Sequence, residues 1–157
     1  MARQLKGQSA MEYLMTYGWA ILIVIIVVAV LFSLGLFNPS TFTQTTATGF
    51  SGFNAPTGGW QLTSGGTLTV QLTNGVGSTI NITEAGANVG SSHVINAYSG
   101  PAGNAVSPGQ TVTLTFTGLT GPASAAAYSA KVNITYTNVG SGVTGFRSAG
   151  TLTGTVS

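Results

Sequence analysis

The longest hydrophobic run of the chain lies near the amino terminus. Residues 18–37 read GWAILIVIIVVAVLFSLGLF and contain no ionisable side chain. At about 1.5 Å of rise per residue, a helix of this length spans roughly 30 Å, the thickness of a bilayer's hydrocarbon core. Only a helix satisfies its own backbone hydrogen bonds in lipid. We predict an apolar transmembrane helix over residues 8–37, ended by Asn38-Pro39, because proline lacks the backbone donor and disfavours helix before it.

Beyond this run, apolar and polar residues alternate in short stretches. A period of two is typical of a half-buried strand, and it recurs in TLTVQLT (67–73), STINITEA (78–85), TVTLTFT (111–117), SAKVNITYT (129–137) and TLTGTVS (151–157). Shorter candidates at 60–63, 93–98 and 144–149 bring the total to seven or eight. Gly, Pro, Asn and Ser separate these stretches, so we expect an antiparallel β-sandwich of immunoglobulin-like size.

The alternation also predicts which side chains fill the core of the sandwich. Every second residue of a strand lies on the same face, and three strands offer apolar sets: Leu68, Val70 and Leu72; Val112, Leu114 and Phe116; Val132, Ile134 and Tyr136. Residues 38–58 have no period and are rich in turn formers, which indicates a linker to a head of residues 59–157. The expected fold class is α+β, with a long apolar helix followed by an all-β head.

Charged residues are scarce and unevenly placed. Four Lys or Arg and two Glu make up 4% of the 157 residues, with one His and no Cys. Arg3 and Lys6 precede the apolar run and the next cation is Lys131, so the positive-inside rule keeps the amino terminus in the cytoplasm and places the remainder outside. Without cysteine, no disulfide framework holds an exported head. No basic patch with interleaved aromatic residues occurs, which argues against nucleic acid as a partner.

One carboxylate stands at the start of the apolar segment. On insertion scales a charged residue costs about 2.5–3.5 kcal/mol at the bilayer centre, and less near the interface, so Glu12 requires a partner. Lys6 lies six residues back, off the helical face that carries Glu12. The chain therefore places an acid beside lipid without an evident cation of its own.

The residues up to this acid, Lys6-Gly7-Gln8-Ser9-Ala10-Met11-Glu12, lead directly into the long apolar helix. The arrangement resembles the class III signal peptide of type IV pilins, in particular the archaeal type IV pilins, over residues 3 to about 37. The resemblance implies a leader of residues 1–7 that carries the Lys6 charge, and a prepilin peptidase that cuts between Gly7 and Gln8. Glu12 would then be the fifth residue of the mature chain, since 12 − 7 = 5.

The resemblance also implies a partner for Glu12 and a route of assembly. The α-amino group freed at Gln8, which titrates near pH 7.7–8.0 in model peptides, is a cation that either the same chain or an adjacent subunit offers to Glu12. The helix stays in the product, and a homopolymer forms through the helices after the precursor has resided in the membrane. Further implied partners are an assembly platform membrane protein and a cytoplasmic ATPase, and the product is an extracellular filament that attaches cells to surfaces.

Other interpretations of the same residues stay open. A cleaved secretory signal has an apolar region of only about 7–15 residues and an A-x-A-like exit, and no such exit occurs before Pro39. A plain membrane anchor leaves Glu12 unexplained. Archaellins, the subunits of the archaeal rotating filament, share the leader and the general plan. A membrane-anchored adhesin or binding module that never polymerises is a further alternative.

The head carries few groups for catalysis. Glu84 is its only carboxylate side chain and His93 is the only imidazole, and no G-x-S-x-G nucleophile elbow accompanies them. Residues 140–145 read G-x-G-x-x-G, but neither a helix pattern nor an acidic residue about twenty positions on follows, so they predict a glycine-rich hairpin loop. We expect no enzymatic activity, no cofactor and no metal site.

Two sequons are candidates for N-glycosylation. Asn81 and Asn133 each begin an N-x-[ST] triplet, whereas Asn38 does not qualify because Pro39 follows it. Surface charge normally keeps a domain soluble, and the head has almost none. Attached sugar or neighbouring subunits would cover such a surface.

Overall fold

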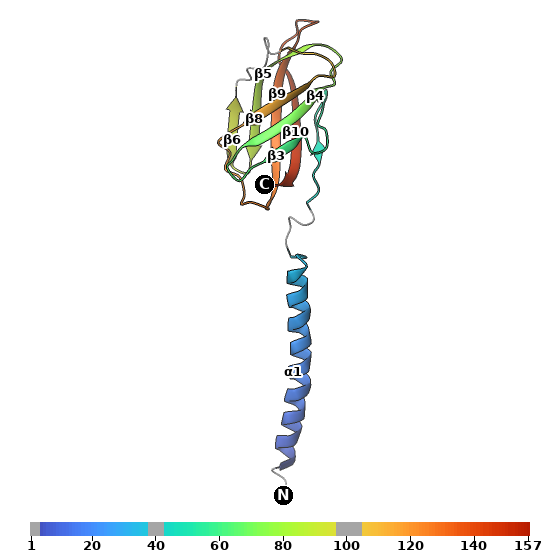
Figure 1. The fold of residues 1–157 in the computed structure, drawn as a ribbon, viewed down its shortest axis with the longest axis vertical. Coiled ribbons are helices and arrows are strands. Elements are labelled where there is room, and N and C mark those ends of the chain that lie inside the picture. Colours follow the sequence, from blue (N-terminus) through green and yellow to red (C-terminus); the bar gives the residue numbers. More distant parts are fainter. Residues whose placement is uncertain (1–3, 38–42, 97–104) are drawn as a thin grey trace. The chain divides into compact units, whose positions relative to one another are not determined.

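A computed structural model of the chain describes residues 4–37, 43–96 and 105–157. The chain divides into two compact units, Met1–Thr41 and Phe42–Ser157, which we call the helix unit and the head and describe separately. The described part of the helix unit contains one helix, α1 (Gln4–Ser33), and the described part of the head contains ten strands (Figure 1). The expected α+β class, a long apolar helix followed by a β head, is confirmed.

Helix α1 ends at Ser33, four residues before the predicted end at Phe37. The N–H groups of Gly35 and Leu36 donate to carbonyl oxygens in the last turn at 3.0 and 3.2 Å, as in a Schellman motif. Gly35 has a φ of 69°, a left-handed conformation that glycine adopts without steric cost. Gly35 therefore ends the helix, and the Asn38-Pro39 pair to which we assigned the stop lies outside the described residues.

Two antiparallel sheets form the head. The larger, six-stranded sheet has the order β1-β10-β9-β5-β6, with β7 also paired to β5; its strands are β1 (Ala47–Thr48), β5 (Ile80–Val89), β6 (Ser92–Asn96), β7 (Ala105–Val106), β9 (Ala127–Asn138) and β10 (Phe146–Thr155). In the four-stranded sheet, β4 pairs with each of the other three strands; its members are β2 (Phe53–Asn54), β3 (Trp60–Leu62), β4 (Leu68–Asn74) and β8 (Thr111–Phe116).

Strand β10 is continuous where the sequence predicts two strands, at 144–149 and 151–157. Gly150, which lies between those stretches, pairs in register with Val132 of β9. The ring of Phe50 occupies the space that a side chain at Gly150 would need. This glycine therefore marks a close approach of a ring to the sheet and not a turn.

The segment expected to be a linker contributes to both sheets. Strand β1 pairs with β10 through Ala47 and Thr48, and strand β2 pairs with β4 through Phe53 and Asn54. Both strands fall within residues 38–58. They were missed because two-residue strands are too short to show a period of two.

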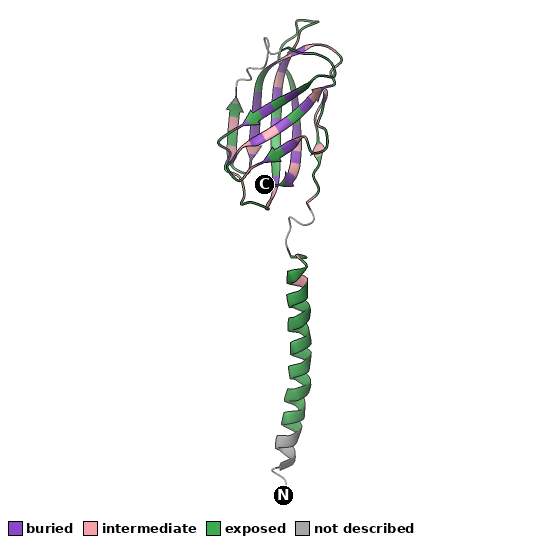
Figure 2. Ribbon diagram, in the orientation of Figure 1, coloured by how far each residue is buried: buried purple, intermediate pink, exposed green. Residues whose placement is uncertain are grey.

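The inner faces of the two sheets share one hydrophobic core. All nine side chains expected there, on β4, β8 and β9, are buried in a single cluster (Figure 2). Trp60 of β3 joins the layers, because its indole Nε1 donates to the Thr153 carbonyl oxygen on β10 at 3.0 Å. The buried residues alternate with exposed ones along β8 and β9, so the period of two in the sequence predicted the burial of these strands correctly.

Candidate assembly helix and a polar face of the head

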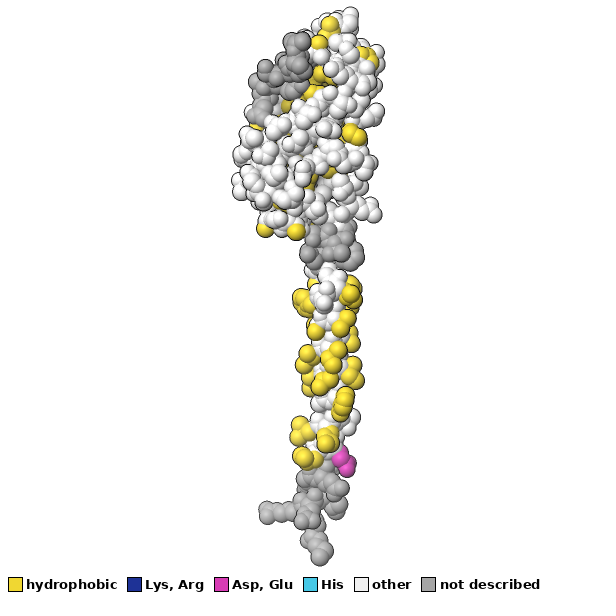
Figure 3. Space-filling view, in the orientation of Figure 1, with side chains coloured by type: hydrophobic (Ala, Val, Ile, Leu, Met, Phe, Trp, Pro, Cys, Tyr) yellow, Lys and Arg dark blue, Asp and Glu magenta, His cyan; other side chains and the backbone are white. Residues whose placement is uncertain are grey.

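Helix α1 exposes apolar side chains all around its circumference. Every residue from Ser9 to Val30 is exposed, including Trp19 at 68% and Ile25 at 62%. Figure 3 shows the hydrophobic side chains along the helix. A helix that is hydrophobic on all sides is normally covered by a protein core or by lipid. Within the described residues, Ser9–Ser33 is the one helix long and apolar enough to cross a membrane.

Glu12 interrupts this apolar surface one turn from the start of the described side chains. The Thr16 hydroxyl donates to the Glu12 backbone carbonyl oxygen at 2.9 Å, and the rings of Tyr13 and Tyr17 lie with their centroids 4.6 Å apart. No partner for the Glu12 carboxylate occurs among the residues whose side chains are described.

The expected cleavage site lies inside α1, since Lys6, Gly7 and Gln8 all have helical backbone. Their side chains fall outside the described part of the chain. The pairing of the Gln8 amino group with Glu12 therefore stays a prediction, as does cleavage after Gly7. The fold places Glu12 about 6 Å along the helix axis from Gln8, because four residues rise by 1.5 Å each, so both groups lie at the same end of the apolar segment.

A second feature lies on the head, where four strands of the six-stranded sheet form a surface that we call the polar face. Across β6, β5, β9 and β10, the register sets outward side chains in three rows: His93, Asn88, Lys131 and Thr151; Ile95, Gly86, Asn133 and Ala149; and Glu84, Thr135 and Arg147. The Lys, Arg, His and Glu side chains of the head all lie in the first and third rows. The scarce charge of the head is thus concentrated on one face.

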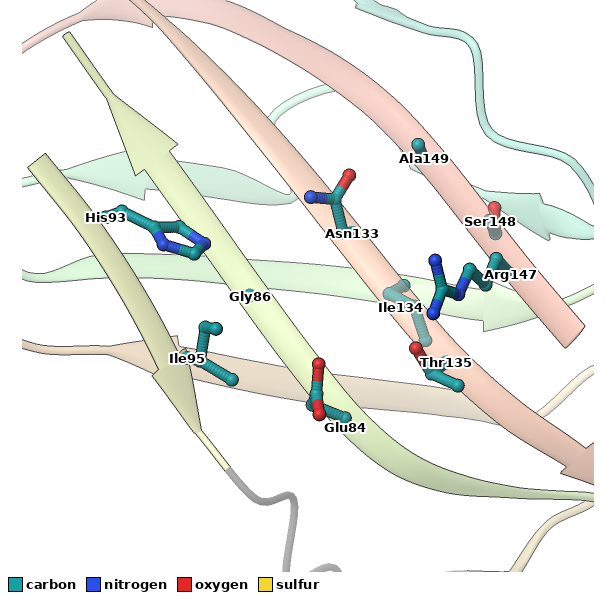
Figure 4. Close-up of a pocket in the computed structure, with 10 residues that line it drawn as sticks. All are labelled: Glu84, Gly86, His93, Ile95, Asn133, Ile134, Thr135, Arg147, Ser148 and Ala149. Atoms are coloured by element: carbon teal, nitrogen blue, oxygen red, sulfur yellow. The ribbon is translucent and has the colours of Figure 1, made fainter. Parts of the chain in front are cut away.

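The middle row of the polar face lines a depression of about 340 Å³, together with Glu84, His93, Thr135 and Arg147 (Figure 4). Gly86 opens it by having no side chain: a Cβ there would lie 3.7 Å from both the His93 Nε2 and the Ile95 Cγ1. Figure 4 shows Arg147 extending from β10 over β9 toward Thr135. We call this hollow the Asn133 depression, since Asn133, on β9 between β5 and β10, is one of the residues that line it.

The two predicted sequons have different surroundings. Asn133 is exposed, and its cross-strand neighbours are the small residues Gly86 and Ala149. Asn81 is half-buried, and its Oδ1 is buried with no hydrogen-bond partner within the described residues. The side chain of Asn133 is therefore exposed to solvent, whereas that of Asn81 is partly enclosed by the sheet.

The structure brings Glu84 and His93 to the same depression without pairing them. His93 lies opposite Asn88 on β5, four residues along that strand from Glu84. The serine that lines the depression, Ser148, turns inward, and its Oγ accepts a hydrogen bond from the Ser51 N–H at 3.0 Å. No nucleophile and base are therefore in contact in the described part of this face. Nor do the described residues contain a group of three His, Cys, Asp or Glu side chains that could hold a metal.

The glycine-rich motif at 140–145 connects β9 to β10, as expected of a hairpin loop. The side-chain Oδ1 of Asn138 accepts hydrogen bonds from the N–H groups of Gly140 and Ser141, at 3.0 and 3.2 Å. These bonds fold the loop back onto the end of β9. Its backbone donors therefore serve the turn and not a phosphate group.

Comparison with known proteins yields no family model that matches the chain. No curated protein matches it either.

Proposed function

We propose that the chain is the precursor of a subunit of an extracellular type IV pilus-like filament that attaches cells to surfaces. The observation that carries the proposal is the exposed apolar surface of α1, because a predominantly apolar segment of 25 residues cannot remain in water. Lipid covers this surface in the precursor. In the filament, the helices of neighbouring subunits cover it.

Glu12 favours a polymer over a permanent anchor. An anchor gains nothing from an acid beside lipid, whose cost falls only when the charge is compensated. In a filament, the amino group at Gln8 of an adjacent subunit supplies that compensation. The attraction is partly offset by desolvation, so the pair contributes mainly to the axial register between helices.

The leader supports the same route. Removal of residues 1–7 takes away Arg3 and Lys6 and leaves the head and helix with a formal charge of 2 − 2 = 0. The cut creates the amino group at Gln8 and frees the helix from the cations that hold its end in the cytoplasm. Cleavage would therefore both release the subunit and supply the partner of Glu12.

The experiment that tests the proposal examines the material sheared from cells without detergent. We expect filaments that contain the chain, with Gln8 as the amino-terminal residue by Edman sequencing or mass spectrometry. A chain that stays in the membrane fraction and begins at Met1 would support the anchored binding module instead. If filaments form, a loss of swimming without a loss of attachment on deletion would identify an archaellin.

A further inference from the structure

The polar face contains a space suited to a covalent modification. Asn133 lies in the middle row of the polar face, and both of its cross-strand neighbours are small, Gly86 on β5 and Ala149 on β10. Side chains at these two positions would normally flank the amide at about 5 Å. Their small size leaves the Asn133 depression, at about 340 Å³, within the range of small-ligand sites.

The groups around this space match the chemistry of a sugar ring. Arg147 and Thr135 offer hydrogen-bond donors, Glu84 offers acceptors, and His93 offers a donor or an acceptor according to its tautomer. Within the described part of the chain, none of these side chains has a hydrogen-bond or ion-pair partner. Ile95, exposed at 56%, adds an apolar edge at the same end as His93. A polyhydroxylated ring would satisfy the polar groups and rest its apolar C–H surface on Ile95.

We propose that Asn133 carries an N-linked glycan and that its first sugar ring lies in the Asn133 depression, against Gly86 and Ala149. The donor is a sugar activated by a phosphate leaving group at its anomeric carbon. The Asn133 Nδ2 forms the bond to that carbon, the bond from the carbon to the phosphate oxygen breaks, and Nδ2 loses a proton. Asn81 stays unmodified because its amide is half-buried in the sheet.

The inference rests on the proposed function only in that the head must be exported to meet the glycosyl donor. The two claims separate experimentally. Filaments whose Asn133 is unmodified would overturn the inference and leave the proposed function standing. A modified Asn133 on a chain that never polymerises would do the reverse.

Tryptic mass spectrometry of the chain from its native cells tests the modification. Trypsin cuts after Lys131 and Arg147, so Asn133 lies on a peptide of residues 132–147, separate from Asn81. We expect this peptide to exceed its polypeptide mass by that of a glycan and Asn81 to be unmodified. Thr135→Ser keeps the sequon and the glycan, whereas Thr135→Val removes both. Peptide 132–147 at its bare mass in the wild type would overturn the inference.

Thermal unfolding of the full chain in detergent tests whether the ring lies in the depression. The glycosylated wild type should unfold at least about 4 °C above Asn133→Gln, a shift that a modest stabilisation gives in a domain of this size. Gly86→Val fills the floor of the depression with a residue that suits a strand. In the Gly86→Val background the glycan should give no shift. An equal shift in both backgrounds would show that the sugar does not occupy the depression.

Discussion

The Thr16 hydroxyl donates a hydrogen bond to the Glu12 backbone carbonyl oxygen, one helical turn away, at 2.9 Å. Thr16 thus satisfies its polar group within the helix, as Thr does in apolar surroundings. The Glu12 carboxylate has no hydrogen-bond or ion-pair partner among the described side chains. The two polar residues at this end of α1 therefore differ: the Thr16 hydroxyl is paired within the helix, whereas for the Glu12 carboxylate we propose a pairing with the amino group at Gln8.

The charge of Glu12 should matter to assembly, while its size should not. Glu12→Gln keeps the shape and removes the charge, so the attraction to the Gln8 amino group is lost. We expect about tenfold less sheared filament, which corresponds to roughly 1.4 kcal/mol per contact. Glu84→Gln makes the same chemical change on the head and should leave the yield unchanged. Equal yields from the two variants, measured by quantitative blotting at equal expression, would remove the proposed role of Glu12.

Replacement of Asn74 should strongly destabilise the head. It is 1% exposed, its Nδ2 donates to the Ser78 and Val106 carbonyl oxygens at 2.9 and 2.8 Å, and its Oδ1 accepts from the Val76 N–H at 2.9 Å. Asn74→Ala leaves these three backbone groups unpaired, so we expect a loss of about 2–4 kcal/mol in the free energy of unfolding.

The matched control for Asn74 is Asn54→Ala, at an exposed position of β2. It should change stability by less than about 0.5 kcal/mol. Urea unfolding of the full chain in detergent, followed by tryptophan fluorescence, measures both. Similar losses in the two variants would contradict the role assigned to the buried amide.

Gly150 and Phe50 should behave as a coupled pair. The Phe50 ring occupies the position of a Cβ at Gly150, so Gly150→Ala should cost about 1–3 kcal/mol by overpacking. Gly140→Ala, in the hairpin loop, meets only ordinary contact with the Asn138 Oδ1 at 3.5 Å and should cost less. In a double-mutant cycle, Phe50→Ala should relieve most of the Gly150→Ala penalty. Additive losses would show that the ring does not pack on Gly150.

Tyr128 should make the head sensitive to alkali. Burial raises the pKa of the Tyr128 phenol above its ordinary value of about 10, and a hydrogen bond with the Leu62 backbone lowers it in part. Since the pKa of Tyr128 is higher in the folded than in the unfolded chain, the neutral phenol contributes to the free energy of unfolding. This contribution is fully present below about pH 10 and is lost as the pH rises through the raised pKa. Tyr128→Phe should flatten the fall of unfolding free energy above pH 10. Parallel curves for the two proteins would contradict this.

The parts of the structure that follow a local period could be predicted from the sequence. The apolar run determines a helix regardless of its neighbours, and alternation along β8 and β9 places residues such as Phe116 and Ile134 in the core. Glycine and proline were less reliable as indicators of where a helix or strand ends. Gly35 ends α1 before the proline is reached, and Gly150 resembles a break in the sequence although it lies within a continuous strand.

The Asn133 depression could not be predicted, because its lining combines the consecutive strands β9 and β10 with β5 and β6, which lie much earlier in the sequence. Gly86, Asn133 and Ala149 become neighbours only through the pairing register of β5, β9 and β10. A shift of one residue would turn Asn133 toward the core. The sequon identified Asn133 as a candidate, but its difference from Asn81 required the sheet. The proposed partner of Glu12 is a different case, because the amino group at Gln8 would arise only when the leader is cleaved.

The central claim is that copies of the same helix cover α1 in the extracellular filament, and the labelling of single cysteines tests it most directly. The chain has no cysteine, so Val24→Cys, at a position 60% exposed in the single chain, gives one reporter on the helix and Ser141→Cys gives one on the head. We expect a water-soluble maleimide to label Ser141→Cys at once in detergent-free sheared filaments and to label Val24→Cys only after denaturation. Equal labelling of both positions, or the absence of the chain from sheared material, would contradict a helix covered by its own copies.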